Sequence, residues 1–196
     1  MVMSLIAVTA LAAQCAPAVA PQTLLAVVRV ESGFDPLAIG VNGPQRTQLH
    51  PATAAEAKTT AERLINQGQS VDLGLGQINS KNLSSLGLTI TQAFDACSNL
   101  EASGRVLQAA YASTSRETEG QDLAVLKALS IYNTGRTDRG FRNGYVAKVT
   151  AAALAIPTVP VLPPAPKPAP PAWDVFAQAE GRASFVLTPV GTGDVQ

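Results

Sequence analysis

Glu31 is the side chain in this sequence that is best placed for acid catalysis. Leu24, Val28 and Glu31 recur at intervals of four and three residues, so the carboxyl shares the helix face that two aliphatic side chains turn toward a core. Burial raises the pKa of a carboxylic acid, and an acid that keeps its proton near neutral pH can protonate a leaving oxygen. The alternative is a surface glutamate that pairs with Arg29 or Lys58.

Four further side chains, in two short segments, suit a ligand rich in amide and hydroxyl groups. Gln77 and Asn79 lie in the stretch D-L-G-L-G-Q-I-N that begins at Asp72, and Tyr132 and Asn133 stand together farther along the chain. Amide and phenol groups both donate and accept hydrogen bonds. The alternative is that these side chains satisfy buried backbone groups.

The elements that must position these residues are mostly helices. Pro21 in a first turn and Gly33 just past a last turn delimit the helix that carries Glu31. The two close glycines of residues 72–79 predict an irregular or short extended stretch. Further helices are predicted over 51–67, 80–86, 91–94, 98–111, 121–133 and 143–155, and in the helix over 121–133 the predicted buried side is marked by Leu123, Leu126 and Leu129.

Composition excludes several classes of function. The 196 residues include 14 Lys and Arg and 14 Asp and Glu, so the net charge is zero and no basic block is available for a nucleic acid. The single His50 and two cysteines are too few for a zinc site, and we expect neither a metal nor another cofactor. No apolar run reaches about 18 residues, so no transmembrane helix is expected.

A proline-rich stretch predicts a boundary near the C-terminal end. Eight of the 14 prolines lie within residues 157–171. Such a sequence cannot maintain helix or sheet hydrogen bonding, so residues 156–172 are predicted as an extended linker. Residues 173–196 form a predicted tail, in which Trp173 and Phe176 either dock a partner or belong to an inert segment.

The N-terminal segment has two interpretations. Residues 1–14 are almost entirely apolar, which is typical of the core of a secretion signal and also of a buried first helix. Residues 15–155 are predicted as one domain, because this length is sufficient for a hydrophobic core.

Four stretches together resemble a known family. They read V-E-S-G-F-D-P-L-A-I-G-V-N, D-L-G-L-G-Q-I-N, A-F-D-A-C-S-N-L and Y-N-T-G, and they begin at positions 30, 72, 93 and 132. In this order they resemble the lysozyme-like lytic transglycosylases, most closely those encoded with type IV secretion systems. The departures are Gly76, where many members of the wider family have methionine, and Ser130-Ile131 in place of alanine before Tyr132.

The resemblance implies a mainly α, lysozyme-like transglycosylase domain followed by a proline-rich, largely unstructured C-terminal tail. In such an enzyme Glu31 would protonate the oxygen of the β-1,4 bond between N-acetylmuramic acid and N-acetylglucosamine. It would then act as base on the muramic C6 hydroxyl, which closes a 1,6-anhydro ring. The implied partners are peptidoglycan glycan strands and, through the tail, components of a type IV secretion or conjugation machinery, and the implied location is the periplasm.

The resemblance also places Gln77 and Tyr132 beside the catalytic acid and implies a substrate-binding role for Ser32, for which a plain polar residue at a helix end is the alternative. Asn79 and Asn133 are predicted to bind the substrate with them through their amides. Tyr145, which follows the glycine-containing loop 135–140, is predicted either to complete the glycan groove or to be a packing tyrosine.

Asp72 stands where animal-type lysozymes carry their second catalytic carboxylate, so the alternative enzyme is a hydrolase that uses Glu31 and Asp72. A turn or cap hydrogen bond is the structural alternative for Asp72. A wall-binding assembly factor with dispensable activity is the alternative for the whole chain.

Cys15 and Cys97 fall where similar sequences often have a cysteine pair. The resemblance therefore implies a disulfide and, with it, an oxidising compartment such as the periplasm. The alternative is two buried free thiols.

Overall fold

The computed structural model describes residues 2–116 and 120–157. The predicted tail and all but the first two residues of the predicted linker lie outside these described residues. The helices are α1 (Leu5–Cys15), α2 (Pro21–Ser32), α3 (Ala54–Asn66), the 3-10 helix η1 (Ser80–Asn82), α4 (Ile90–Ala93), α5 (Ala96–Thr114), α6 (Gln121–Thr134), α7 (Arg139–Arg142) and α8 (Tyr145–Ala155). The strands are β1 (Ile39–Val41), β2 (Thr47–Leu49), β3 (Val71–Leu73) and β4 (Ile78–Asn79).

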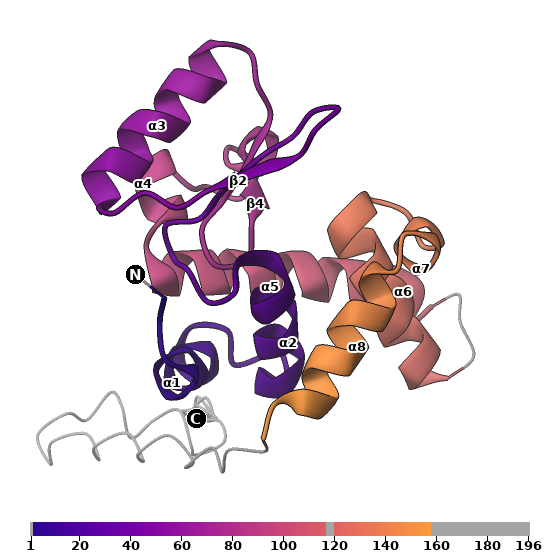
Figure 1. Cartoon of the computed structure of the whole chain (residues 1–196). Helices are drawn as coiled ribbons and strands as arrows, with labels where there is room; N and C mark the ends of the chain where they lie inside the picture. The colour runs from indigo at the N-terminus through magenta and orange to yellow at the C-terminus, as the bar shows by residue number, and fades with distance from the viewer. Residues whose placement is uncertain (1, 117–119, 158–196) are drawn as a thin grey trace, which may run out of the picture. The chain divides into compact units, whose positions relative to one another are not determined.

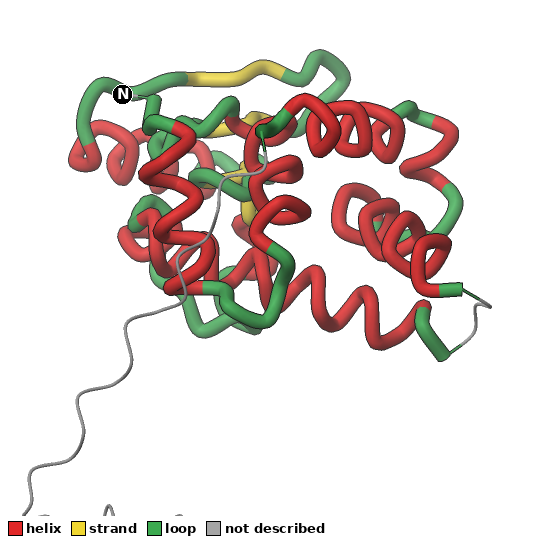
Figure 2. Tube along the Cα trace, turned by 90° about the horizontal axis from the view of Figure 1, so that it is seen from below, coloured by secondary structure: helices red, strands yellow, loops and turns green. Residues whose placement is uncertain are grey.

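Helix α5 runs through the middle of the domain (Figure 1). The strands, α3 and α4 lie on one side of it, α1 and α2 lie on the other, and α6, α7 and α8 gather toward one end. The strands form an antiparallel sheet in the order β2-β1-β3-β4. Helices make up most of the described trace (Figure 2), so the mainly α fold class is confirmed.

The hydrophobic side chains form two clusters, and α5 contributes to both. The first cluster joins α1, α2, α5, α6 and α8, and it includes Leu24, Val28 and Leu100. The second joins the sheet to α3 and α4, and it includes Leu73 and Ala102. The helix that carries Glu31 therefore belongs to one cluster and the sheet to the other.

Helix α2 has the ends and the buried face that the sequence predicts. Pro21 occupies the first turn, and Gly33 ends the helix in the left-handed conformation at φ 61°. Leu24 and Val28 are fully buried. Because the helix ends one residue after Glu31, this carboxyl lies at the helix end where a negative charge is disfavoured.

The structure differs from the sequence prediction in three places. The pair β1–β2 was not predicted, and within 80–86 only η1 is helical. Leu123 is 44% exposed, so its predicted place on the buried side of α6 is wrong. The buried residues of α6 are Ala124, Ala128, Leu129 and Ser130, so Leu129 does lie on the buried side as predicted.

The N-terminal segment forms α1 and contributes to the core. Val8 and Ala12 are fully buried in the first cluster. A disulfide joins Cys15, the last residue of α1, to Cys97 in the first turn of α5, with the two Cα atoms 5.4 Å apart. Within residues 2–116 and 120–157, no helix combines the length and apolar character needed to cross a membrane.

Replacement of both cysteines by alanine is expected to lower the free energy of unfolding by about 4.5 kcal/mol, the chain-entropy value for a loop of this size. The cross-link spans 82 residues, so its removal releases a large closed loop in the unfolded chain. Urea denaturation of the variant and of the oxidised protein measures the difference. The wild-type protein under reductant should match the variant, and equal stability of the oxidised protein and the variant would contradict the prediction.

Candidate active site

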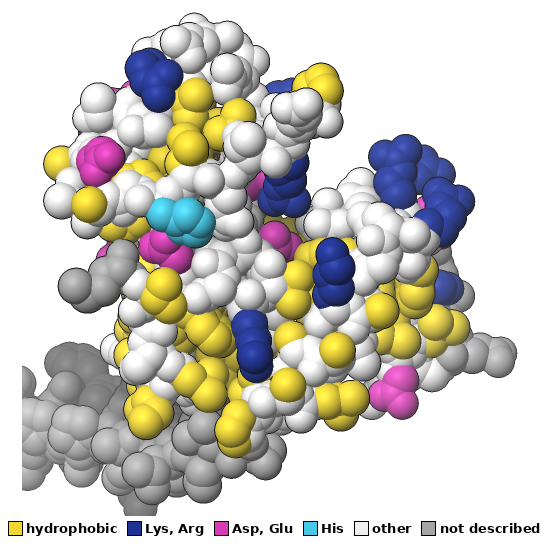
Figure 3. Space-filling view, in the orientation of Figure 1, with side chains coloured by type: hydrophobic (Ala, Val, Ile, Leu, Met, Phe, Trp, Pro, Cys, Tyr) yellow, Lys and Arg dark blue, Asp and Glu magenta, His cyan; other side chains and the backbone are white. Residues whose placement is uncertain are grey.

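A polar cleft of about 400 Å³ contains the predicted catalytic acid. Its walls come from the end of α2, the β1–β2 hairpin, α6, and the start of α8 with the segment before it. Figure 3 shows the surface hollowed between the part that holds the sheet and the helices beside it, with acidic and basic side chains next to the hollow. The lining residues are Val30, Glu31, Arg46, Thr47, Gln48, Asn133, Asn143, Tyr145 and Lys148.

The surroundings of Glu31 favour its protonated form. Burial raises the pKa of its carboxyl to about 7. A hydrogen bond from Tyr145 and the charge of Arg46 lower this pKa, and the charge of Asp72 raises it. The Tyr145 hydroxyl donates to Glu31 Oε1 over 2.6 Å. This contact replaces the surface ion pair that the alternative interpretation of Glu31 required.

Tyr145 is held by the turn that precedes α8. Gly144 takes a left-handed conformation at φ 78°, and the Tyr145 backbone amide donates to Asn143 Oδ1 over 2.9 Å. The Asn143 amide donates in turn to Asn133 Oδ1 over 2.9 Å. Asn143 therefore links two of the sequence-predicted residues, Asn133 and Tyr145, and fixes the helix start from which the phenol reaches Glu31.

Asp72 is engaged on both of its carboxylate oxygens. Asn42 donates to Oδ2 over 3.0 Å, and Arg46 donates to the same oxygen over 3.3 Å. Asn79 donates to Oδ1 over 2.7 Å. These donors hold Asp72 on β3 as the centre of a polar network, and Asp72 does not line the cleft.

Gln77 is buried behind the cleft wall with one amide atom unpaired. Its Nε2 donates to the carbonyls of Ala38 and Gly74 over 3.1 and 3.0 Å, which fixes the orientation of the amide. Its Oε1 has no hydrogen-bond partner within the described residues. A Cβ at Gly40 would lie 2.6 Å from this oxygen, so the glycine leaves it room. Gln77 also has φ 52°, an uncommon conformation for a residue with a side chain.

Tyr132 connects α6 to the segment between β3 and β4. Its hydroxyl donates to the Gly76 carbonyl over 2.7 Å, and burial, followed by the charge of Glu31, raises the pKa of the phenol above its usual range. A Cβ at Gly76 would overlap the Ser103 hydroxyl and lie 2.8 Å from the Tyr132 hydroxyl. This packing explains the glycine at a position where many members of the wider family have methionine.

Ser32 and Asn79 are occupied by contacts within the fold. The Ser32 hydroxyl is buried and donates to the Val28 carbonyl over 3.2 Å. The Asn79 amide donates to the Ser70 hydroxyl as well as to Asp72, and its oxygen accepts from the backbone of Lys81. Neither residue lines the cleft.

Sequence reasoning missed several residues of the cleft. Gln48 donates to the Glu31 backbone carbonyl over 3.3 Å, and Arg46 contacts Asp72, yet both come from a hairpin that was not predicted. Lys148 follows Tyr145 by three residues on α8, and this spacing places the two side chains on one helix face. Because Tyr145 was predicted as a site residue, its position in the sequence could have pointed to Lys148 and Asn143 as residues of the same cleft.

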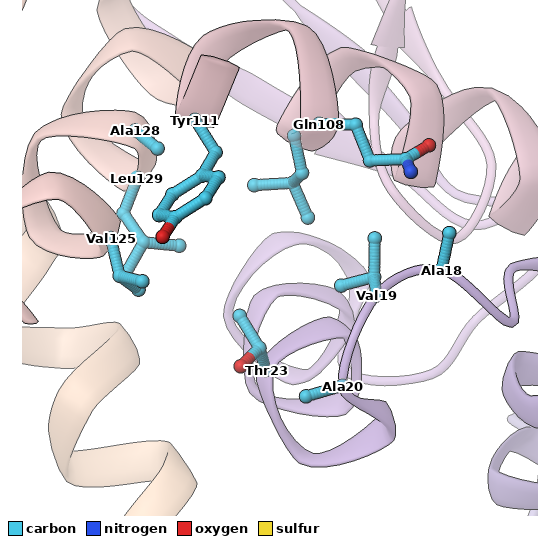
Figure 4. A pocket seen from close by; sticks show the side chains of 10 residues that line it. Ala18, Val19, Ala20, Thr23, Gln108, Tyr111, Val125, Ala128 and Leu129 are labelled. Carbon is cyan, nitrogen blue, oxygen red and sulfur yellow. The ribbon is translucent and has the colours of Figure 1, made fainter. Parts of the chain in front are cut away.

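A second pocket, of about 190 Å³, is apolar and lies elsewhere (Figure 4). Tyr111 and Val125 stand on one side of it, and Val19 and Thr23 stand on the other. It shares no lining residue with the Glu31 cleft and contains no carboxylic acid. The Glu31 cleft is therefore the candidate active site.

Comparisons with known proteins relate the chain to one family. A family model described as "Transglycosylase SLT domain" matches residues 9–154. The chain is 44% identical over 153 residues to "Protein virB1" of Rhizobium radiobacter, covering 78% of this chain and 63% of the relative. It is 44% identical over 149 residues to "Type IV secretion system protein virB1" of Brucella abortus biovar 1, covering 73% and 62%.

The chain thus spans a little under two thirds of the length of these two relatives. A longer alignment, 39% identical over 176 residues, relates it to "Protein virB1" of Agrobacterium fabrum and covers 88% of this chain and 71% of that protein. No solved structure gives a significant match.

Replacement of Glu31 by glutamine is expected to stabilise the protein increasingly as pH rises from about 4.5 to 7. The folded pKa of about 7 lies above the ordinary value of 4.5, so the folded protein keeps a proton that the unfolded chain has released across this window, and stability falls as pH rises. The free-energy difference between variant and wild type should grow by about 3 kcal/mol between pH 4 and pH 8. Urea denaturation at both pH values measures it.

The matched control is Glu101→Gln, which removes an exposed glutamate from α5. Its effect on stability should vary little with pH. A Glu31→Gln effect that is the same at both pH values would contradict the raised pKa.

Proposed function

The chain belongs to the transglycosylase SLT family, and on that basis we propose that it is a peptidoglycan lytic transglycosylase with Glu31 as its catalytic acid. The observation that carries the proposal is the buried Glu31 carboxyl in a polar cleft, with a pKa raised to about 7. An acid of this kind is protonated in a large fraction of molecules at neutral pH, as proton transfer to a leaving oxygen requires.

The proposed reaction uses Glu31 twice. The protonated carboxyl gives its proton to the oxygen of the β-1,4 bond as the bond to muramic C1 breaks, and N-acetylglucosamine leaves as an alcohol. The resulting carboxylate takes the proton of the muramic C6 hydroxyl, whose oxygen bonds to C1 and closes the 1,6-anhydro ring. Atoms balance without water, and Glu31 ends protonated, as it began.

Tyr145 supports the carboxylate form of this acid. Its hydroxyl donates to Glu31 Oε1, so it stabilises the carboxylate that forms after the first proton transfer and lowers the pKa that burial raises. Asn133 and Asn143 present amide groups in the cleft beside it. We assign these two side chains to the binding of acetamido and hydroxyl groups of the glycan.

Gln77, Tyr132, Asn79 and Ser32 are proposed to act from behind the cleft wall. They hold the segments that shape the cleft, since each has protein partners and none lines the open space. Among the buried side-chain nitrogen and oxygen atoms of the described residues, Gln77 Oε1 is the one that has no hydrogen-bond partner.

The engaged state of Asp72 favours the transglycosylase over the hydrolase. A nucleophilic carboxylate needs an oxygen free to approach the sugar C1 atom. Both Asp72 oxygens accept hydrogen bonds from Asn42, Arg46 and Asn79, and the side chain is only 13% exposed. We propose that Asp72 fixes this network rather than attacking the substrate.

The proposed setting is the cell wall, where the enzyme opens gaps locally for a type IV secretion or conjugation machinery. A relative's printed name assigns it to a type IV secretion system, and the Cys15–Cys97 disulfide suits an oxidising compartment. We therefore propose a periplasmic location. The proposed docking of Trp173 and Phe176 to another secretion component concerns residues outside the described part of the chain.

Digestion of purified peptidoglycan is expected to release fragments that end in 1,6-anhydromuramic acid, because the C6 hydroxyl replaces water as the nucleophile. Mass spectrometry separates these ends from reducing ends, which differ by the mass of one water. Glu31→Gln should reduce the rate by at least about 100-fold, the lower range for general acid-base catalysis.

Glu101→Gln is the matched control and should retain activity. Reducing ends in the wild-type products would favour the hydrolase that uses Glu31 and Asp72. Full cleavage by the Glu31→Gln variant would remove Glu31 from the acid role, and absence of cleavage by any form would favour the assembly factor.

Replacement of Tyr145 by phenylalanine is expected to move the alkaline limb of the pH profile of kcat/KM to higher pH. The lost hydrogen bond lowers the pKa of Glu31 in the wild type, so its removal raises that pKa above about 7 and extends the protonated range. Initial rates across the pH range measure the limb. Tyr111→Phe, in the apolar pocket, is the control, and an unchanged or lower limb in Tyr145→Phe would overturn the assigned contact.

A further inference from the structure

Two basic side chains enter the Glu31 cleft from different walls. Arg46 precedes β2 in the hairpin, and its side chain is 53% exposed. Lys148 lies in the first turn of α8, one helical turn after Tyr145, and is exposed. Figure 3 shows basic side chains beside this hollow. Glu31 therefore lies in a cleft that has a cation on the sheet side and another on the helix side.

Both cations retain hydrogen-bonding capacity for a ligand. Arg46 has one short contact, from Nη2 to Asp72, and a guanidinium carries five N–H donors. Within residues 2–116 and 120–157, the Lys148 ammonium has no hydrogen bond or ion pair; the backbone amide of this residue donates to the Gly144 carbonyl. Several other exposed cations have acidic partners, including Lys58 with Glu62 and Arg142 with Asp138.

The charge of the cleft favours an anion when the acid is ready to react. Among the described residues that line the cleft, Glu31 is the only carboxylic acid, and in its protonated form it is neutral. Asp72 lies behind the lining and offsets part of the charge of Arg46. Lys148 has no such offset among the described residues, so the cleft presents net positive charge to a ligand.

We propose that Arg46 and Lys148 bind a carboxylate carried by the muramic acid residue at the bond that is cleaved. This inference rests on the proposed function and names the feature of the glycan that the cleft selects. Muramic acid differs from N-acetylglucosamine by a lactyl ether, whose carboxylate is either free or amide-linked to a stem peptide with carboxylates of its own. A polymer of N-acetylglucosamine has none, so the two cations select muramic acid by charge.

The test measures binding rather than turnover, with the full-length Glu31→Gln protein. The ligands are soluble glycan strands that keep their stem peptides and strands from which an amidase has removed them. Each is used in its native form and after conversion of its carboxylates to neutral amides. Titration calorimetry at low and high salt gives the dissociation constants. If amidation weakens the binding of strands without peptides, the bound carboxylate is that of the lactyl group. If amidation weakens the binding of strands that keep their stem peptides, the bound carboxylate is that of the peptide.

In this background, Arg46→Gln and Lys148→Gln are each expected to weaken binding of native strands by about fivefold at low salt and by less at high salt. Amidated strands should bind the parent and both variants with similar affinity. The matched controls are Arg63→Gln on α3 and Lys81→Gln in η1, which remove exposed cations that do not line the cleft.

Equal affinity of the parent protein for native and amidated strands would overturn this inference and leave the proposed function intact. If Arg46→Gln and Lys148→Gln weaken binding no more than the two control variants, the inference is also overturned and the proposed function again stands. Absence of binding to every strand would overturn the inference and the proposed function together.

Discussion

Burial of the Glu31 carboxyl is the constraint on which the arrangement of the cleft depends. A carboxylate loses favourable hydration when it is buried, so Glu31 holds its proton to about pH 7. The helix end adds to this effect, and the Tyr145 hydroxyl limits it by donating to Oε1. Since Tyr145 follows Glu31 by 114 residues, the acidity of one side chain depends on the packing of α8 against α2.

The two hydrophobic clusters have different parts in the cleft. The helical cluster holds α2 and α8, and so it supplies the acid and the phenol that contacts it. The other cluster holds the sheet, on which Asp72 and its donors form a polar network. Arg46 belongs to both settings, because it contacts Asp72 and its charge lowers the pKa of Glu31. The wall that carries the sheet therefore acts on Glu31 in two ways: Arg46 lowers its pKa through charge, and Gln48 contacts its backbone carbonyl.

The sequence was informative where local spacing determines position. Leu24, Val28 and Gly33 placed Glu31 at the end of a helix and on its inner face, and the structure has both features. Local spacing could not predict that the Gln77 amide faces backbone carbonyls or that Arg46 reaches Asp72, because both contacts depend on strand pairing between distant segments. The misplaced Leu123 has a related cause: leucine spacing alone does not show which leucines share the buried face of α6, where Leu129 lies with two alanines.

The Cys15–Cys97 bond encloses Glu31 and the sheet in one covalent loop, whereas Tyr145 lies beyond it. Closing a contact across a long stretch of chain costs more conformational entropy than closing a short one, and the cross-link shortens the covalent path between the acid and the phenol. In the unfolded chain Glu31 is in water and has the ordinary acidity of a glutamic acid. The packing of α8 against α2 that completes the helical core is therefore also part of what makes Glu31 an acid suited to neutral pH.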